Sequence, residues 1–356
     1  MAFVDLTRRT RTAALVLLAA LSALVLGPFL APSPATAGTA IRFTLDRKID
    51  GPAAPFFVAI DKGYFKDEGL DVTIDVAPGG PLEVLNRLAT GKADMGVADV
   101  NLLIKFRDAN GAPIKAVFSV FDKPPYAITA RKSRGIVAPR DLQDKKLGAP
   151  ATDPTFAQWP IFAKVADIDT AKVAIEDVGF PVLEPMLAAG EVDAITGFSF
   201  TTYVDLKAGG VPPDDLVLLP MADYGVALYG DAIMASPSFA EEKPDAVRAF
   251  LRAYARALKD TVRDPALAIE ALLRHSEGLS KDIELERLRM AIRDNIVTPA
   301  VQANGFGSID PVRFAAAIDQ IALAYRFKSK DKAAAAFDRS FLPRAAERRL
   351  DDAASR

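Results

Sequence analysis

The sequence predicts an α/β protein built from two similar lobes. Apolar stretches with the two-residue period of strands alternate with stretches of helical period, which favours a mainly parallel sheet covered on both faces. Without its leader the chain keeps about 320 residues, more than one hydrophobic core usually holds. A short motif occurs at 88–97 and again at 187–196, so one α/β unit is expected to occur twice.

The first 37 residues have the composition of a secretory signal peptide. Three arginines between positions 8 and 11 precede an uncharged Leu/Ala-rich stretch at 13–26, and Ala35-Thr36-Ala37 is a small-x-small cleavage motif. A transmembrane anchor is the alternative, but the apolar stretch is short for a span and no second one follows. We expect a soluble protein of a Gram-negative periplasm. The general export route is preferred, and the twin-arginine route stays open.

Charge and cysteine content exclude several classes of function. The 44 Lys and Arg nearly balance the 46 Asp and Glu, so no field for nucleic acid or an anionic membrane is implied. The chain has no cysteine and one histidine, which removes disulfides, a cysteine-linked lipid anchor and most zinc or thiol chemistry. We expect a monomer with no cofactor, no metal and no catalytic residue.

The stretch 55–76 defines the first α/β unit of the chain. Phe56, Phe57 and Ile60 share one side of a short helix, and Gly63 is expected to end it in a left-handed conformation. After a compact connector, apolar and polar residues alternate from 70 to 76, which predicts a strand. The other elements expected in this lobe are a strand at 41–45, a loop at 51–55, a helix from Pro81 with Leu82, Leu85, Leu88 and Ala89 on its apolar face, a strand at 95–98, a helix at 100–109 capped by Asp99, and a strand at 114–121.

The repeated motif reads LATGKADMGV at 88–97 and LAAGEVDAIT at 187–196. Both copies predict a helix end, a glycine cap and an aspartate ahead of a buried strand. A fortuitous match of so short a motif is the alternative. If the repeat is real, Asp99 and Phe198-Ser199 follow equivalent strands. Ligands of open α/β sheets bind beyond the carboxyl ends of strands, so two facing lobes would form a cleft there.

The second lobe is expected to start near Tyr126. Thr152-Asp153-Pro154-Thr155 predicts a helix N-cap, followed by Phe156, Trp159 and Phe162 on one helix. Free N–H groups at this cap suit an electron-rich ligand atom, and an ordinary cap beside an aromatic core stripe is the alternative. The remaining expected elements are strands at 127–130, 146–149, 173–178, 194–196 and 216–219, a short helix at 139–142, a return strand at 231–235, and helices at 246–263, 267–275, 283–294 and 311–325 that pack on lobe one.

Several phrases of this sequence resemble one family of transport proteins. The chain is similar to the periplasmic solute-binding proteins of ABC transporters in the nitrate, taurine, aliphatic-sulfonate and thiamine-pyrimidine-precursor group. The phrases are APFFVA at 54–59, KGYFK at 62–66, EGLDV at 68–72, LATGKAD at 88–94 and DLQDKKLG at 141–148, and the resemblance extends from 41 to about 262.

The resemblance implies a type II periplasmic-binding fold that traps a solute by hinge closure between two lobes. Crossings between the lobes are expected near 123–127 and 228–231. The expected organisation is a signal peptide at 1–37, the first part of lobe one at 38–126, lobe two at 127–230, the return strand and C-terminal helices of lobe one at 231–345, and a tail at 346–356.

The family's pocket, carried onto this sequence, uses the loops after several strands. Each glycine among them also fits a simple turn, and Asp99 also fits helix capping alone. The candidate ligand-binding residues, including the aromatic side chains that could stack on a ligand, are Asp50, Gly51, Gly79, Gly80, Asp99, Phe121, Thr152, Asp153, Phe156, Trp159, Phe198, Ser199 and Tyr224.

The charges of these loops bear on the class of ligand. Asp50, Asp99, Asp153 and Asp223 are present, with only Arg47 and Lys123 as nearby cations, so a desolvated nitrate or sulfonate would be repelled. Carboxylates and aromatic rings suit a flat nitrogen-containing molecule, such as a thiamine-precursor pyrimidine. A sulfonate such as taurine, nitrate or another organic anion is the alternative.

Several alternatives to solute binding lack their sequence signatures in this chain. Eukaryotic relatives of the pyrimidine branch include enzymes that use a cysteine-rich motif and their own histidine, and this chain lacks the cysteines. No helix-turn-helix, G-x-S-x-G motif or histidine-centred triad is present. We expect binding without chemistry, and delivery of a small solute to a membrane permease that works with a cytoplasmic ATPase.

Overall fold

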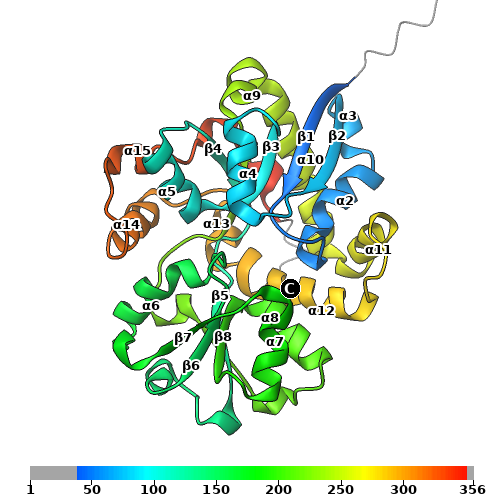
Figure 1. Ribbon diagram of the computed structural model, residues 1–356. Coiled ribbons are helices and arrows are strands. Elements are labelled where there is room, and N and C mark those ends of the chain that lie inside the picture. Colours follow the sequence, from blue (N-terminus) through cyan, green and yellow to red (C-terminus); the bar gives the residue numbers. More distant parts are fainter. Residues whose placement is uncertain (1–37, 351–356) are drawn as a thin grey trace, which may run out of the picture. The chain divides into compact units, whose positions relative to one another are not determined.

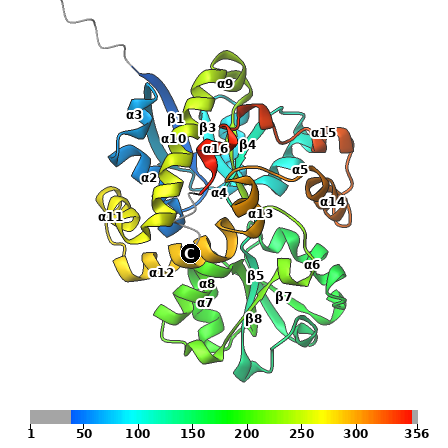
Figure 2. The ribbon, with the colours of Figure 1, turned by 180° about the vertical axis from the view of Figure 1, so that it is seen from behind.

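The computed structural model of the protein describes residues 38–350 (Figures 1 and 2). The expected signal peptide, and the end of the expected tail, lie outside these residues. Two five-stranded sheets form the framework. In the order of their pairing, the first contains β2 (Leu70–Val76), β1 (Thr39–Leu45), β3 (Met95–Asp99), β10 (Asp231–Ala235) and β4 (Lys115–Ser119), and the second contains β7 (Ala174–Asp177), β6 (Lys146–Ala149), β8 (Ala194–Phe198), β5 (Tyr126–Arg131) and β9 (Leu216–Pro220).

The expected mainly parallel arrangement holds for four of the five strands in each sheet, but both sheets are mixed because one strand of each runs in the opposite direction. β10 pairs antiparallel with β3 and β4, and β5 pairs antiparallel with β8 and β9. These two strands are the ones by which the chain enters each sheet from the other. Because β5 and β10 run in the opposite direction, the first residue of each lies beside the last residues of its neighbouring strands. The fold has the predicted return strand and two crossing segments, residues 120–125 and 225–230.

The helices of the first lobe follow the sequence pattern closely. They are α2 (Ala54–Asp61), α3 (Tyr64–Asp67), α4 (Gly80–Ala89) and α5 (Val100–Asn110). Gly63 takes the expected left-handed conformation with φ of 72°. The Asp99 carboxylate caps α5 by accepting the Leu102 N–H at 2.6 Å. Leu82 was wrongly placed on the buried face of α4: it is 50% exposed, because Val84 completes that face with Leu85 and Leu88.

The second lobe corrects the expected cap at Thr152. Its helices are α6 (Trp159–Val165), α7 (Phe180–Ala189) and α8 (Ser199–Ala208), and a 3-10 helix at Phe156–Gln158 leads into α6. No cap forms at Thr152, which is exposed. Instead, the Asp153 carboxylate accepts the Thr155 N–H at 2.9 Å, so that this N–H is not free for a ligand.

The internal repeat is confirmed by matching contacts in the two sheets. Asp94, before β3, accepts the Arg42 N–H at 2.8 Å, and Asp193, before β8, accepts the Lys146 N–H at 2.9 Å. An arginine side chain bonds each aspartate and the carbonyl of the preceding glycine cap: Arg42 with Gly91, and Arg134 with Gly190. The strand orders also correspond, since β3 and β8 each lie at the centre of a sheet.

The C-terminal helices surround the first lobe, and one of them also contacts the second. They are α9 (Pro237–Glu242), α10 (Pro244–Arg263), α11 (Pro265–His275), α12 (Lys281–Ala291) with a π-helical extension at Ile292–Ile296, α13 (Pro299–Asn304), α14 (Pro311–Ile321), α15 (Lys330–Ala334) and α16 (Ala345–Arg348). α10 and α11 pack on α2, as expected (Figures 1 and 2). α12 packs on α8 as well, where Arg287 pairs with Asp205 at 2.7 Å. Within residues 38–350 we find no helix long and apolar enough to cross a membrane.

Candidate ligand-binding site

The two crossing segments lie side by side and bring the strand ends of both sheets together. The Val120 N–H donates to the Asp231 carbonyl at 2.8 Å, and the Gly230 N–H donates to the Phe121 carbonyl at 3.1 Å. The segment after β1 starts with Asp46, while β3 ends at Asp99 and β8 ends at Phe198. These neighbours form the candidate site.

Arg47 stands at the centre of this site. Its Nη1 lies 2.7 Å from the Asp231 carboxylate and 3.3 Å from that of Asp46, and its Nε lies 3.7 Å from Asp50. The guanidinium carbon lies 5.0 Å from the ring centre of Phe198 and 5.8 Å from that of Phe121. The cation therefore contacts carboxylates of the first lobe and an aromatic ring of the second.

Carboxylates outnumber guanidinium groups at this centre. Asp46, Asp50, Asp99 and Asp231 are each less than 5% exposed. Burial raises the pKa of Asp46 to about 8, and the charges of Asp231 and Asp50 add to the rise that Arg47 opposes. Burial also raises the pKa of Asp50. Burial alone would lower the pKa of Arg47, but the three adjacent carboxylates raise it, so the guanidinium stays charged.

Asp99 anchors a second polar group that joins the lobes. The Tyr126 hydroxyl, at the start of β5, donates to its carboxylate. The Asn101 amide donates to the Tyr126 oxygen at 2.9 Å and to the Tyr229 carbonyl at 2.7 Å. Burial, and then the charge of Asp231, raise the pKa of Asp99 to about 7. The cap expected from the sequence is therefore also part of a contact between the two lobes.

The free space beside Arg47 is small. The cavity has a volume of about 20 Å³, enough for one water molecule. Its lining includes the apolar Pro52, Phe56 and Val97 as well as Asp46, Asp50 and Lys48. A solute can occupy this place only if Arg47 moves or the lobes separate.

Several predicted site residues meet here. Asp50, Phe121 and Phe198 surround Arg47, and Asp99 lies one contact away through Asp231. Gly51 is adjacent, but its N–H already donates to the Glu284 carboxylate at 2.6 Å.

Gly79, Gly80 and Ser199, also predicted as site residues, lie at the starts of α4 and α8. The backbone N–H groups of Gly79 and Ser199 have partners within the protein. The Gly79 N–H donates to Glu83 at 2.6 Å at the start of α4, and Gly80 takes a positive φ of 73° there. Ser199 is buried at the start of α8, and its N–H donates to the Pro125 carbonyl.

The remaining candidates form a separate cluster in the second lobe. Asp153 accepts the Thr196 hydroxyl at 2.5 Å, and its burial raises its pKa. The Phe162 ring lies 6.2 Å from that of Trp159 and 6.0 Å from that of Tyr224. Phe156 is half-buried against the core. Asp153, Trp159 and Tyr224 thus have partners within lobe two, and Thr152 is exposed.

Asp46, Asp231, Tyr126 and Asn101 are not among the residues predicted from the sequence, and Arg47 is predicted there only as a nearby cation. Asp46 follows β1 directly, so the rule that places ligands beyond strand ends would have found it. Asp231 begins a strand that runs in the opposite direction, and only the mixed sheet brings its N-terminal end to the same edge.

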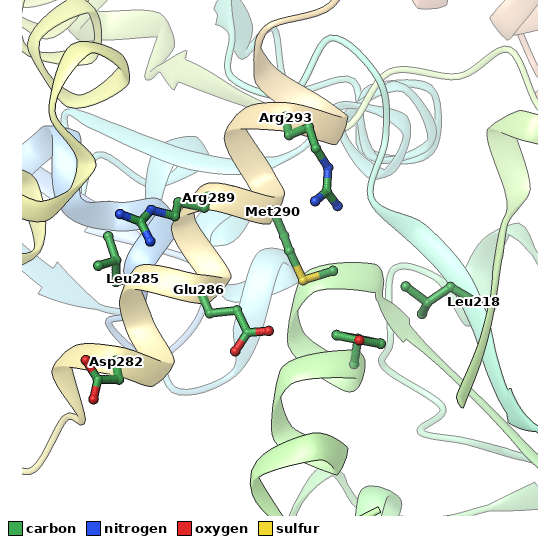
Figure 3. Close-up of a pocket in the computed structure, with 8 residues that line it drawn as sticks. Leu218, Asp282, Leu285, Glu286, Arg289, Met290 and Arg293 are labelled. Carbon is green, nitrogen blue, oxygen red and sulfur yellow. The ribbon is translucent and has the colours of Figure 1, made fainter. Parts of the chain in front are cut away.

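A wider groove lies elsewhere, between α12 and the second lobe (Figure 3). It measures about 690 Å³, and its walls come from α12, with Asp282, Glu286 and Arg289, and from Leu218 of β9. Glu286 is held at its rim by Lys207 at 2.7 Å. We do not assign the ligand to this groove, because neither Arg47 nor the residues that surround it line its walls. Within residues 38–350, no group of histidine and carboxylate side chains has the arrangement of a metal site.

Comparison with known proteins identifies the family. A profile described as NMT1/THI5 like matches residues 52–268, more than half of the chain. The chain belongs to this family. The riboflavin-binding protein RibY of Chloroflexus aurantiacus is 27% identical over 240 residues, which are 66% of each chain, just under two thirds.

Two further curated relatives differ in their named roles. The formylaminopyrimidine-binding protein of Halalkalibacterium halodurans is 28% identical over 66% of this chain and 72% of its own length. The 4-amino-5-hydroxymethyl-2-methylpyrimidine phosphate synthase of Schizosaccharomyces pombe is 24% identical over 65% of this chain and 68% of its own. The family thus includes named binding proteins and named enzymes.

Solved structures share the fold at low identity. The periplasmic aliphatic sulphonate binding protein SsuA of Escherichia coli superposes with a TM-score of 0.64 at 14% identity, covering 80% of this chain and 86% of its own. The periplasmic nitrate-binding protein NrtA of Synechocystis PCC 6803 gives a TM-score of 0.61 at 11% identity, covering 87% of both chains. The fold of this family member is therefore that of periplasmic binding proteins.

Proposed function

We propose that this protein is the periplasmic solute-binding component of an ABC importer. The observation that carries the proposal is the convergence of strand ends, crossing segments and aromatic rings of both lobes on one buried polar centre around Arg47. The names of the binding-protein relatives support it. Residues 38–126 and 231–345 would form one lobe and 127–230 the other, and hinge closure would trap the solute for transfer to a membrane permease.

We propose a flat nitrogen-containing compound as the solute. The buried carboxylates can accept N–H donors, and Phe121 and Phe198 offer faces for stacking. A formylaminopyrimidine, as named for one relative, is an example of this class. An organic anion would have to enter beside four buried carboxyl groups, and those that are ionised would repel it.

We propose that the protein binds its solute without changing it. The named synthases among its relatives make this a question for experiment. The chain has no cysteine, and its single histidine, His275, pairs with Asp61 and stacks on Phe57 at a ring distance of 5.1 Å. Neither contact belongs to the centre around Arg47.

A panel of compounds tests the function by thermal unfolding. The panel comprises riboflavin, formylaminopyrimidine, 4-amino-5-hydroxymethyl-2-methylpyrimidine, taurine and nitrate. A solute at a hundredfold excess over its Kd stabilises the folded state by roughly 2.7 kcal/mol, so binding raises Tm. We expect a rise with a nitrogen heterocycle, and recovery of that compound unchanged after incubation. Stabilisation by taurine or nitrate alone would contradict the ligand class, and chemical conversion would contradict the absence of catalysis.

A further inference from the structure

The place of Arg47 resembles that of a bound ligand more than that of a surface arginine. Its guanidinium is a planar cation with N–H donors, held by Asp46 and Asp231 and adjacent to the rings of Phe121 and Phe198. The side chain is 27% exposed, so it has a route to solvent. It is joined to the first lobe by its own backbone, directly after β1.

The hydrogen bonding at this centre leaves acceptors to spare. One carboxylate oxygen of Asp50 and one of Asp231 are buried without a hydrogen-bond partner. Asp50 lies 3.7 Å from the Arg47 Nε, which is an ion pair but too long for a hydrogen bond. A buried acceptor without a donor costs free energy, so a planar group with better-placed N–H donors would satisfy this centre more fully than Arg47 does.

The charge of the centre points to the same class of group. If Arg47 left, Asp46, Asp50 and Asp231 would face the vacated space, with Asp99 behind Asp231. Without the Arg47 guanidinium, Asp46 and Asp231 lose the cation that contacts them, while Arg287 and Lys48 still act on Asp50. The vacated place therefore attracts a cation or strong donor more than an anion.

We propose that the Arg47 guanidinium occupies the place of the solute's own headgroup, and that this headgroup is a planar amidine-type group, as in amidinium ions and aminopyrimidines. Arg47 is then a tethered competitor: the solute binds by displacing it, and only a group that reproduces its donors and its stacking does so well. This inference rests on the proposed solute-binding function and adds the headgroup and the residue that selects it.

Three compounds of nearly equal shape test the headgroup. Benzamidine carries an amidinium, benzamide a neutral amide and benzoate a carboxylate on the same ring. Their affinities are measured by calorimetry for the wild type, for Arg47→Ala and for Arg47→Gln, which keeps a planar amide if Arg47→Ala does not fold. Arg42→Ala is the matched control, because Arg42 also lies in an aspartate ion pair but in the middle of β1, away from the centre around Arg47.

The predicted result is a gain of affinity. If Arg47 fills its place in about 90% of molecules, removing it tightens benzamidine binding about tenfold, since the apparent Kd scales inversely with the competent fraction. Of the three compounds, benzamidine should have the highest affinity for Arg47→Ala, or for Arg47→Gln if that variant is used instead. Arg42→Ala should bind all three as the wild type does.

Two results would overturn the proposal. One is preferential binding of benzoate by the wild type, lost in Arg47→Ala, which would make Arg47 a receptor for anions. The other is benzamidine binding that is unchanged or weaker in a position-47 variant with a cooperative unfolding transition. The order of affinities of the wild type for the three compounds is measured without any variant. A preference of the wild type for benzoate would therefore count against the proposal even if both variants misfold. Either failure leaves the importer function intact, which falls only if the wild type binds no solute of any class in the broader panel.

Discussion

At the scale of single residues, burial shifts the pKa values of carboxyl groups around Arg47. This shift makes the stability of the folded protein depend on pH. Asp46 and Asp99 have pKa values raised to about 8 and about 7. Between its unfolded-state pKa of about 4 and its folded-state pKa, each group binds more protons in the folded protein. Stability therefore falls as pH rises from about 4 to about 8 through these two groups.

Asp99→Asn should reduce this loss of stability with pH. Asparagine caps a helix about as well as aspartate, and it removes a buried group whose ionisation costs stability above its unfolded-state pKa. We expect the free energy of unfolding of the variant to fall less steeply than that of the wild type between pH 4 and 7, as measured by urea denaturation. Parallel curves for the two proteins would show that Asp99 does not titrate in this range.

The same scale shows why the site could be predicted only in part. Asp50, Asp99, Phe121 and Phe198 lie at or after strand ends that the sequence pattern locates, and the structure brings them together around Arg47. The position of Arg47 among three carboxylates depends on Asp231, which is far away in the sequence and reaches it through β10. No local pattern around residue 47 indicates that contact.

At the scale of elements, α14 stabilises the crossings between the sheets. The Arg313 Nη2 donates to the Asp122 carbonyl and to the Leu228 carbonyl, each at 2.6 Å, so that one side chain bonds both crossing segments. Its guanidinium carbon also lies 4.0 Å from the ring centre of Tyr229. A C-terminal helix thus supplies the side chain that links the two crossing segments.

Arg313→Ala should destabilise the protein by on the order of 2–3 kcal/mol, because hydrogen bonds from a charged group are lost and their acceptors are left behind. Arg140→Ala is the matched control: its ion pair with Asp167 is exposed on both sides, and such pairs contribute less than about 1 kcal/mol. Denaturant unfolding measures both. Equal, small effects for the two variants would show that Arg313 does not support the crossings.

Element prediction succeeded where a local signal exists and failed where a tertiary contact decides. Gly63 and the Asp99 cap were found because glycine and aspartate have strong positional preferences at helix ends. The expected cap at Thr152 failed because the Asp153 carboxylate takes the Thr155 N–H and the Thr196 hydroxyl, and the helix starts only at Trp159. The second of these contacts comes from β8, which the local sequence does not show.

At the scale of the whole molecule, the repeat explains the architecture better than the alternation of strands and helices does. The alternation suggested parallel sheets, whereas the two copies of one motif indicated two equivalent lobes, which the matched contacts of Asp94 and Asp193 confirm. Two strands that exchange lobes make both sheets mixed and place the polar centre beside the crossings. The fold thus builds its candidate site at the crossings that hinge closure would use.

The most direct measurement is mass spectrometry of small molecules released by denaturing the protein purified from its native cells. The account predicts a single enriched, flat nitrogen-containing compound, present in amounts near one per protein and absent from a control preparation of unrelated periplasmic protein. A sulfonate, nitrate or carboxylate recovered in its place would contradict the argument from the buried carboxylates around Arg47.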